Sequence, residues 1–196
     1  MNGIDVSHHN GVIDWNKVVN DVFKPEFAYI KTTEGTGYID PKFAINAKAA
    51  NKAGIKVGYY HFASLNSTDV VGDAVKEAEA YIKAVKSVPT PTMPLVLDIE
   101  TNKAKLSKVQ VLLWIKTFFA ELAKIGWTDV ILYSYTPFLN ENLPINHDLG
   151  NIKLWIADYA PPLILPKGWN KAYIWQYSAK GKISGISTNT DLNKTM

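Results

Sequence analysis

The 196-residue chain contains no cysteine. Without thiols it has no disulfide framework, no thiol nucleophile and no thiolate metal site, and it can work in either redox compartment. It also lacks a basic tract, an RNA-binding signature and a heptad pattern, and its formal net charge is only +3. We therefore expect no nucleic-acid partner.

Long apolar runs are missing as well. None approaches the roughly 18 residues that span a bilayer, so we expect no membrane insertion. The first ten residues, MNGIDVSHHN, show no charged region followed by an apolar stretch, so no signal peptide is visible. GxGxxG, GxxxxGK[ST], GxSxG and HExxH are also absent. Phosphate-loop nucleotide binding, serine catalysis at a nucleophile elbow and a zinc site are therefore unsupported.

Aromatic residues are abundant by contrast, with 6 Trp, 10 Tyr and 7 Phe making up 12% of the chain. Part of this set belongs in a core, but flat ligands such as carbohydrates are also commonly held on aromatic rings. The remaining composition, 47% hydrophobic and 20% charged, is that of an ordinary globular protein. We expect one domain over residues 1–196.

Short β-rich runs alternate with helical patterns. We expect strands at 3–7, 27–33, 56–64, 95–100, 129–136, 153–159, 172–178 and 182–193. We expect helices at 14–23, 40–54, 69–87 and 107–126 and a short one around 137–143, with Asp14, Asp40 and Asp69 as caps.

Five strand–helix pairs followed by three strands predict an α/β fold, a TIM-like (β/α)5(β)3 barrel with eight strands and five helices. An open doubly wound sheet is the competing topology. The sequence lacks a Gly-rich phosphate loop, which weakens this alternative. An open sheet would also leave the edges of three bare strands uncovered.

One of these strands, PLVLDIET at 94–101, ends in two acids, Asp98 and Glu100. Side chains at i and i+2 of a strand share a face, and two adjacent like charges are costly unless one holds a proton or both bind something. In a parallel β/α barrel the chemistry lies at the carboxyl ends of strands. That rule gathers acids, aromatics and other polar residues at one mouth: Asp5, Lys31, Glu34, Tyr60, His61, Asp98, Glu100, Tyr133, Trp155, Asp158, Trp175, Gln176 and Asp191.

Some of these residues have a purely structural interpretation. His61, between Tyr60 and Phe62, is typical of a hydrogen-bonded histidine at the edge of a core. Asp158 could accept hydrogen bonds from loop amides, and Asp191 could form an Asx-turn. The acids together could instead hold Mg²⁺ or Ca²⁺, which would make a metal-dependent hydrolase.

Motifs along almost the whole chain carry a resemblance to a known family. In order, they are GIDVSHHNGVIDW, YIKTTEGTGYIDPKF, AGIKVGYYHFAS, PLVLDIE, VILYSY, LWIADY, IWQYS and DLN. As a set they resemble the family 25 glycoside hydrolases, the lysozymes of bacteria, fungi and many phages.

The resemblance implies a barrel of five helices and eight strands that cleaves the β-1,4 bond between N-acetylmuramic acid and N-acetylglucosamine in peptidoglycan. It implies that Asp5, Asp98, Glu100 and Asp191 form the active site, with Glu100 as general acid. Neighbouring carboxylates would raise the pKa of Glu100 by like-charge repulsion, while Asp98 stays ionised and orients the substrate's 2-acetamido group. Retention by this substrate-assisted route is one expectation, and inversion through water activated by Asp5 or Asp191 stays open.

For seven of the other mouth residues the expectation is substrate binding. Sugar subsites would be lined by Tyr60, His61, Tyr133, Trp155, Asp158, Trp175 and Gln176. We expect no cofactor and no metal, a monomer, and peptidoglycan glycan strands as the partner. The place of action would be the bacterial cell wall, reached through a holin-type hole, by another export route or after removal of a leader. A non-catalytic wall-binding barrel is the alternative function.

Overall fold

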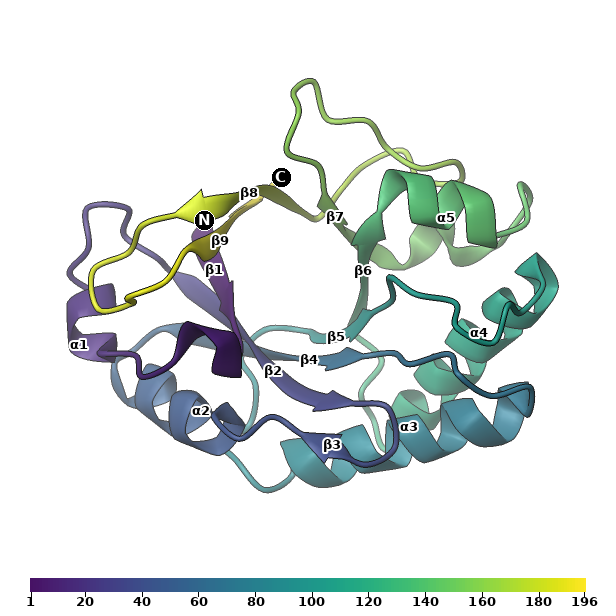
Figure 1. The fold of residues 1–196 in the computed structure, drawn as a ribbon, viewed down its shortest axis with the longest axis horizontal. Helices are drawn as coiled ribbons and strands as arrows, with labels where there is room; N and C mark the ends of the chain where they lie inside the picture. The colour runs from purple at the N-terminus through teal and green to yellow at the C-terminus, as the bar shows by residue number, and fades with distance from the viewer.

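A closed barrel of eight strands forms the centre of the protein, whose computed structural model describes residues 1–196 (Figure 1). The barrel strands are β1 (Asn2–Val6), β2 (Phe27–Glu34), β4 (Lys56–Phe62), β5 (Leu95–Asp98), β6 (Val130–Tyr135), β7 (Lys153–Ala157), β8 (Ile174–Gly181) and β9 (Thr190–Thr195). Pairing of β1 with β2 closes the ring. A further two-residue strand, β3 (Tyr38–Ile39), folds back on the end of β2 as a hairpin, which the sequence did not predict.

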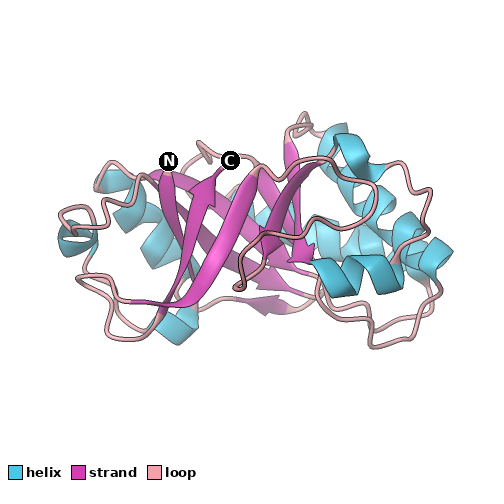
Figure 2. Cartoon of the chain, turned by 90° about the horizontal axis from the view of Figure 1, so that it is seen from above, coloured by secondary structure: helices cyan, strands magenta, loops and turns pink.

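Five α-helices follow the first barrel strands in turn. They are α1 (Trp15–Val18), α2 (Phe43–Lys52), α3 (Val70–Val85), α4 (Lys108–Lys124) and α5 (Thr136–Asn142), and two short 3₁₀ turns, η1 (His8–Asn10) and η2 (Leu149–Asn151), complete the set. No helix or 3₁₀ turn separates β7, β8 and β9, and loops alone connect these strands (Figure 2). The predicted (β/α)5(β)3 fold is confirmed. No helix combines the length and the apolarity that crossing a bilayer requires.

The last strand runs against its neighbours. Every barrel pair from β1–β2 to β7–β8 is parallel, whereas β9 is antiparallel to both β8 and β1. The start of β9 therefore lies at the mouth where the other strands end. In this register Asp191 stands directly opposite Asp5.

Two predicted helix starts are confirmed and one is wrong. Asp14 and Asp69 cap α1 and α3 by accepting backbone N–H groups. Asp40 is not the cap of α2, because its carboxylate accepts hydrogen bonds from the backbone N–H groups of Lys42 and His8. The first helix also stops earlier than predicted, since the Asp21 carboxylate accepts from Phe23 N–H and offers the chain a local turn instead.

Side chains that point into the barrel form a separate apolar cluster that fills its lower half. Its buried members are Phe27, Tyr29, Met93, Val96, Ile131, Tyr133, Trp155 and Ile174. A larger cluster of 42 residues lies outside the barrel, under the helices. The interior is thus a packed plug at one end, and only the mouth has room for polar groups.

We expect Gly58→Ala to test this packing, because a Cβ there would lie 2.1 Å from the Tyr29 ring. The clash should lower the free energy of unfolding by about 1–3 kcal/mol in urea denaturation. Gly37→Ala is the matched control, since a Cβ at Gly37 meets nothing within 4 Å. Equal stability of the two variants would contradict a close-packed interior.

Candidate active site

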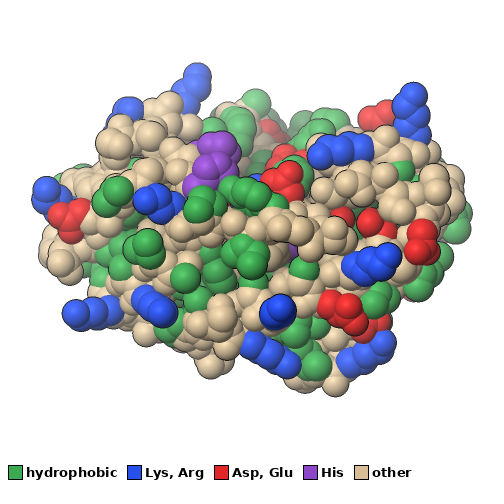
Figure 3. All heavy atoms as spheres, turned by 60° about the horizontal axis from the view of Figure 1, so that its bottom comes forward, with side chains coloured by type: hydrophobic (Ala, Val, Ile, Leu, Met, Phe, Trp, Pro, Cys, Tyr) green, Lys and Arg blue, Asp and Glu red, His purple; other side chains and the backbone are tan.

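A cavity of about 500 Å³ opens at the mouth of the barrel. Four carboxyl side chains line it, those of Asp5, Asp98, Glu100 and Asp191. The other lining residues are Ser7, His9, Asn10, Lys31, Tyr60, Phe62, Tyr133, Trp155, Tyr159, Gln176, Thr188 and Asn189. Seen from the side of the β2–β3 hairpin, acidic side chains lie in a hollow next to histidine side chains (Figure 3).

Asp98 and Glu100 enter the cavity from the end of β5. The strand ends at Asp98, and Glu100 follows two residues later, where the chain leaves the sheet. Asp98 is 6% exposed, and its Oδ1 has no hydrogen-bond partner, whereas Glu100 is partly exposed. Asp98 therefore lies deeper in the cavity, with a free acceptor atom, and Glu100 lies nearer its opening.

Burial raises the pKa of both carboxyls in this pair. For Asp98 the pKa lies well above the usual range, through burial first and then through the charge of Glu100. Burial is also the main cause of the raised pKa of Glu100. Desolvation thus outweighs the like-charge repulsion that the sequence suggested. The raised pKa values favour a proton shared between the two carboxyls.

Asp5 and Asp191 form a second carboxyl pair, across the β1–β9 ladder. The Asp5 Oδ2 atom accepts hydrogen bonds from Asn193 Nδ2 at 2.7 Å and from Gln176 Nε2 at 3.0 Å. Burial and the Asp191 charge raise the pKa of Asp5 well above its usual range, and the two amides partly oppose this. The pKa of Asp191 is raised chiefly by burial.

Lys31 is the one lysine that lines the cavity. Its side chain is 10% exposed, and its Nζ lies 2.7 Å from Glu34 Oε2 and 4.8 Å from the centre of the Phe62 ring. The Lys31 charge lowers the pKa of both Asp98 and Glu100, against the effect of burial. Lys31 therefore offsets part of the effect of burial on these two acids.

Aromatic and amide side chains complete the cavity wall. The hydroxyls of Tyr133 and Tyr159 both donate to Gln176 Oε1, at 3.0 and 2.7 Å. Trp155 is almost fully buried beside Tyr133, and its Nε1–H donates to Asn193 Oδ1 at 2.8 Å. One continuous network of hydrogen bonds therefore runs from these rings through Gln176 and Asn193 to Asp5.

Comparison with known proteins shows to which family a chain with this fold and site belongs. The sequence profile of the glycosyl hydrolases family 25 matches residues 4–186. The chain belongs to glycosyl hydrolase family 25. This confirms the resemblance read from the motifs, and the protein is a glycoside hydrolase.

Several relatives of this family 25 hydrolase have been described. Lysozyme M1 of Streptomyces globisporus is 36% identical over 202 residues, which cover 99% of the chain and 67% of the relative. The autolytic lysozyme of Clostridium acetobutylicum is 31% identical over 99% of the chain and 55% of its own length. The crystal structure of a bacterial lysozyme from Streptomyces coelicolor is 33% identical, with a TM-score of 0.88 over 100% of the chain and 91% of that structure.

The family 25 fold brings eight of the eleven predicted site residues into the cavity: Asp5, Asp98, Glu100, Asp191, Tyr60, Tyr133, Trp155 and Gln176. Eight lining residues were not predicted to contact substrate, among them Tyr159 and Lys31. Tyr159 is the last residue of the predicted strand 153–159 but was not singled out, and in the structure it lies in the loop after β7. Lys31 was noticed at a strand end but given no role, although its position on an inward-facing stretch of β2 was a usable signal.

His61, Asp158 and Trp175 lie outside the cavity. His61 and Trp175 alternate with the inward-facing Tyr60 and Gln176, so their side chains point away from the barrel interior. His61 is fully buried, and Trp175 donates its Nε1–H to Asp158 O. Asp158 accepts from two loop amides, as its structural interpretation required. We do not include these three residues in the site.

The four acids do not form a metal centre by their arrangement. Nowhere in the chain do three or more His, Asp or Glu side chains gather as the ligands of a cation would. Asp5 is instead held by hydrogen bonds from Asn193 and Gln176, and Asp98 is buried without a partner at Oδ1.

We expect Asp98→Asn to stabilise the hydrolase at pH 7 but not at pH 4. Because the folded-state pKa of Asp98 is raised, the folded protein binds more protons than the unfolded chain, and stability falls as the pH rises above the unfolded pKa. Removing the charge should raise the Tm at pH 7 by about 2–6 °C. Thermal unfolding followed by circular dichroism across this pH range measures the effect.

Asp148→Asn is the control for that experiment. This carboxyl is exposed, and its pKa is lowered by the hydrogen bond from Lys116, so its removal should give no gain at pH 7. A Tm difference between wild type and Asp98→Asn that does not vary with pH would contradict the assignment of a raised pKa to Asp98.

Proposed function

We propose that this hydrolase is a lysozyme, an N-acetylmuramidase that cleaves the β-1,4 bond between N-acetylmuramic acid and N-acetylglucosamine in peptidoglycan. The observation that supports this most is the buried Asp98–Glu100 pair at the mouth of the barrel, where burial raises the pKa of both carboxyls. The two relatives named as lysozymes support the substrate, although the chain spans only 67% and 55% of their lengths. Peptidoglycan as substrate makes the bacterial wall the place of action.

Glu100 is the proposed general acid because it lies nearer the opening, where a glycosidic oxygen can reach it. Asp98 lies deeper, with its free Oδ1 available to accept a hydrogen bond. When the N–H of the substrate's 2-acetamido group donates to Asp98, the hydrogen bond favours the ionised form of that carboxyl. The shared proton then passes to Glu100, so substrate binding itself leaves the general acid protonated.

Bond cleavage follows from this arrangement. The acetamido oxygen attacks the anomeric carbon as the bond to the leaving oxygen breaks, and that oxygen takes the proton of Glu100. Ionised Asp98 stabilises the positive charge that develops on the acetamido group. Glu100, now a carboxylate, then removes a proton from the water that opens the cyclic intermediate, which gives a product of retained configuration.

The other lining groups would bind the glycan strand. Asp5 is a fixed acceptor, because Asn193 and Gln176 both hold the same oxygen atom. Tyr60, Tyr133 and Trp155 supply ring faces and edges at the mouth. In the competing inverting route, Asp5 or Asp191 would activate a water molecule instead.

We expect Glu100→Gln to lower the rate of clearing of purified bacterial walls by about 10²–10⁴-fold, the usual contribution of a general acid. Turbidity loss measures this, and Glu79→Gln, on the exposed face of α3, is the control with unchanged activity. Clearing should persist in EDTA. Equal clearing by wild type and Glu100→Gln would contradict the acid role, and loss of clearing in EDTA would favour a metal-dependent hydrolase.

The stereochemistry of the first product tests the role of Asp98. Substrate-assisted cleavage should release the new reducing end initially as the β anomer, which later equilibrates. Proton NMR during the first minutes of digestion resolves the two anomers. An initial α anomer would mean that water attacks directly and would move the base role to Asp5 or Asp191.

A further inference from the structure

A second cavity of about 470 Å³ adjoins the catalytic one. The two cavities share His9 and Lys31. The remaining lining of the second cavity is His8, Glu34, Gly35, Thr36, Gly37, Tyr38, Ser64 and Asn66. All of its lining residues except Tyr38 are polar, charged or glycine, and the mechanism proposed above uses none of them.

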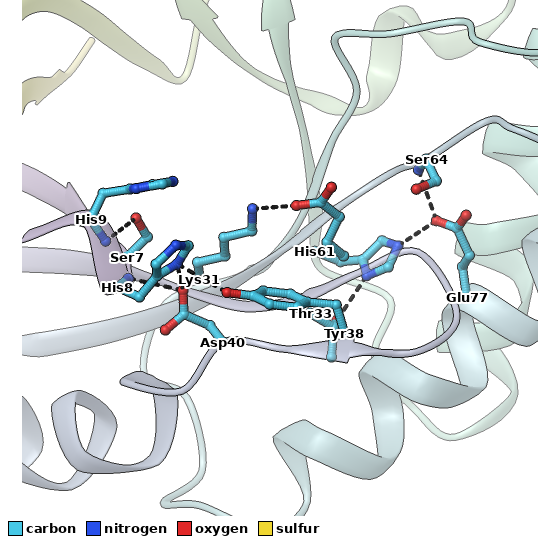
Figure 4. Close-up of polar contacts among 11 residues, drawn as sticks. Ser7, His8, His9, Lys31, Thr33, Tyr38, Asp40, His61, Ser64 and Glu77 are labelled. Carbon is cyan, nitrogen blue, oxygen red and sulfur yellow. Dashed lines mark hydrogen bonds and ion pairs between the residues drawn. The ribbon is translucent and has the colours of Figure 1, made fainter.

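Hydrogen bonds hold one wall of this second cavity in place (Figure 4). The Asp40 carboxylate accepts from the His8 backbone N–H at 2.9 Å and lies 2.8 Å from His8 Nδ1. The Tyr38 hydroxyl lies 3.1 Å from the same ring nitrogen. These contacts join η1 to the β2–β3 hairpin.

The opposite wall depends on buried groups between β4 and α3. Ser64 donates its backbone N–H to Glu77 Oε2, and the same oxygen lies 2.7 Å from His61 Nε2. His61 Nδ1 lies 2.8 Å from Thr33 Oγ1, so the chain of contacts returns to β2 (Figure 4). His61 therefore positions the wall of the second cavity from behind, although it touches neither cavity.

We propose that the second cavity binds the peptide branch carried on O3 of N-acetylmuramic acid. The inference rests on the proposed function, which places the 2-acetamido group of that sugar against Asp98. Carbons 2 and 3 of a pyranose ring are adjacent, so the O3 substituent leaves the ring beside the acetamido group. Lys31 acts electrostatically on Asp98 and also lines the second cavity. A branch that leaves the sugar on this side meets Lys31 and continues into the second cavity.

The lining suits a peptide better than a further sugar. Lys31 Nζ uses one donor on Glu34 and retains others for a carbonyl oxygen of the branch. Glu34, Ser64 and Asn66 supply acceptors and donors that match amide N–H and C=O groups. Tyr38, 39% exposed, is the one aromatic face there, apart from the histidines, whereas a sugar subsite would use broader ring surfaces.

Gly37→Tyr tests this proposal, because Gly37 lines only the second cavity and has open space where a side chain would begin. The two substrates are soluble glycan strands that carry their peptides and the same strands stripped by an amidase. The measurement is kcat/KM from released reducing ends. In Gly37→Tyr the ratio of kcat/KM for peptide-bearing over stripped strands should fall by about tenfold or more.

Ile39→Tyr is the matched control, since it adds the same ring to an exposed position of β3 that lines neither cavity. This variant should keep the wild-type ratio. Thermal unfolding of both variants shows whether each is folded. A wild type that cuts only peptide-bearing strands would support the proposal, and kcat/KM on that substrate then becomes the readout for Gly37→Tyr.

Failure of this inference is distinguishable from failure of the proposed function. A wild type that releases no reducing ends from either substrate refutes the muramidase itself. A wild type that cuts both, together with a Gly37→Tyr ratio equal to that of Ile39→Tyr, refutes the branch cavity alone. An N-acetylmuramoyl dipeptide should also inhibit wild type more strongly than N-acetylmuramic acid does, and Gly37→Tyr should lose that difference.

Discussion

Burial of two carboxyls at the end of one short strand is the constraint on which the rest of the site depends. Asp98 and Glu100 cannot both be ionised cheaply in a cavity that removes them from water. A proton must therefore stay with the pair well above the pH at which an exposed carboxyl loses it. A glycosidase needs such a proton on its acid. For Glu100 burial is the main cause of the raised pKa and the Asp191 charge adds to it, whereas the hydrogen bond with Asp98 and the charge of Lys31 oppose it.

The barrel makes this burial possible. Aromatic and aliphatic side chains plug its lower half, so water reaches the acids only from the mouth. Closure by an antiparallel strand then places Asp191 and Asn193 opposite β1, where they meet Asp5. A parallel last strand would have put the start of β9 at the other end of the barrel, away from the cavity. The direction of that one strand thus brings the second carboxyl pair to the first.

Local pattern and the strand-end rule were enough to predict the barrel and about half of the lining residues, and the family resemblance singled out the four acids among those at the mouth. They failed where side-chain direction matters, since His61 and Trp175 point outward while Tyr60 and Gln176 point inward. The alternation of a strand was available in the sequence and would have separated these neighbours.

Other features could not be read from local patterns. The direction of β9 and the place of Tyr159 depend on contacts between segments that are distant in the sequence. The balance between burial and repulsion at Asp98 depends on how much of the carboxyl the finished fold covers. The covered fraction of the carboxyl is set by packing around the site and cannot be read from the sequence of residues 94–101, which contain the acid.

Lys31 influences how readily the acids keep a proton, because its charge lowers the pKa of Asp98 and Glu100. A free ammonium among four carboxyls would lower their pKa values and favour loss of the proton that catalysis needs. Glu34 prevents this in part, because its carboxylate lies 2.7 Å from Lys31 Nζ and offsets much of the lysine's charge. The partly exposed Glu34 also lies in the second cavity, so a branch that engages Lys31 would change how strongly that lysine acts on Asp98. Recognition of the branch and control of the proton would then act through the same side chain.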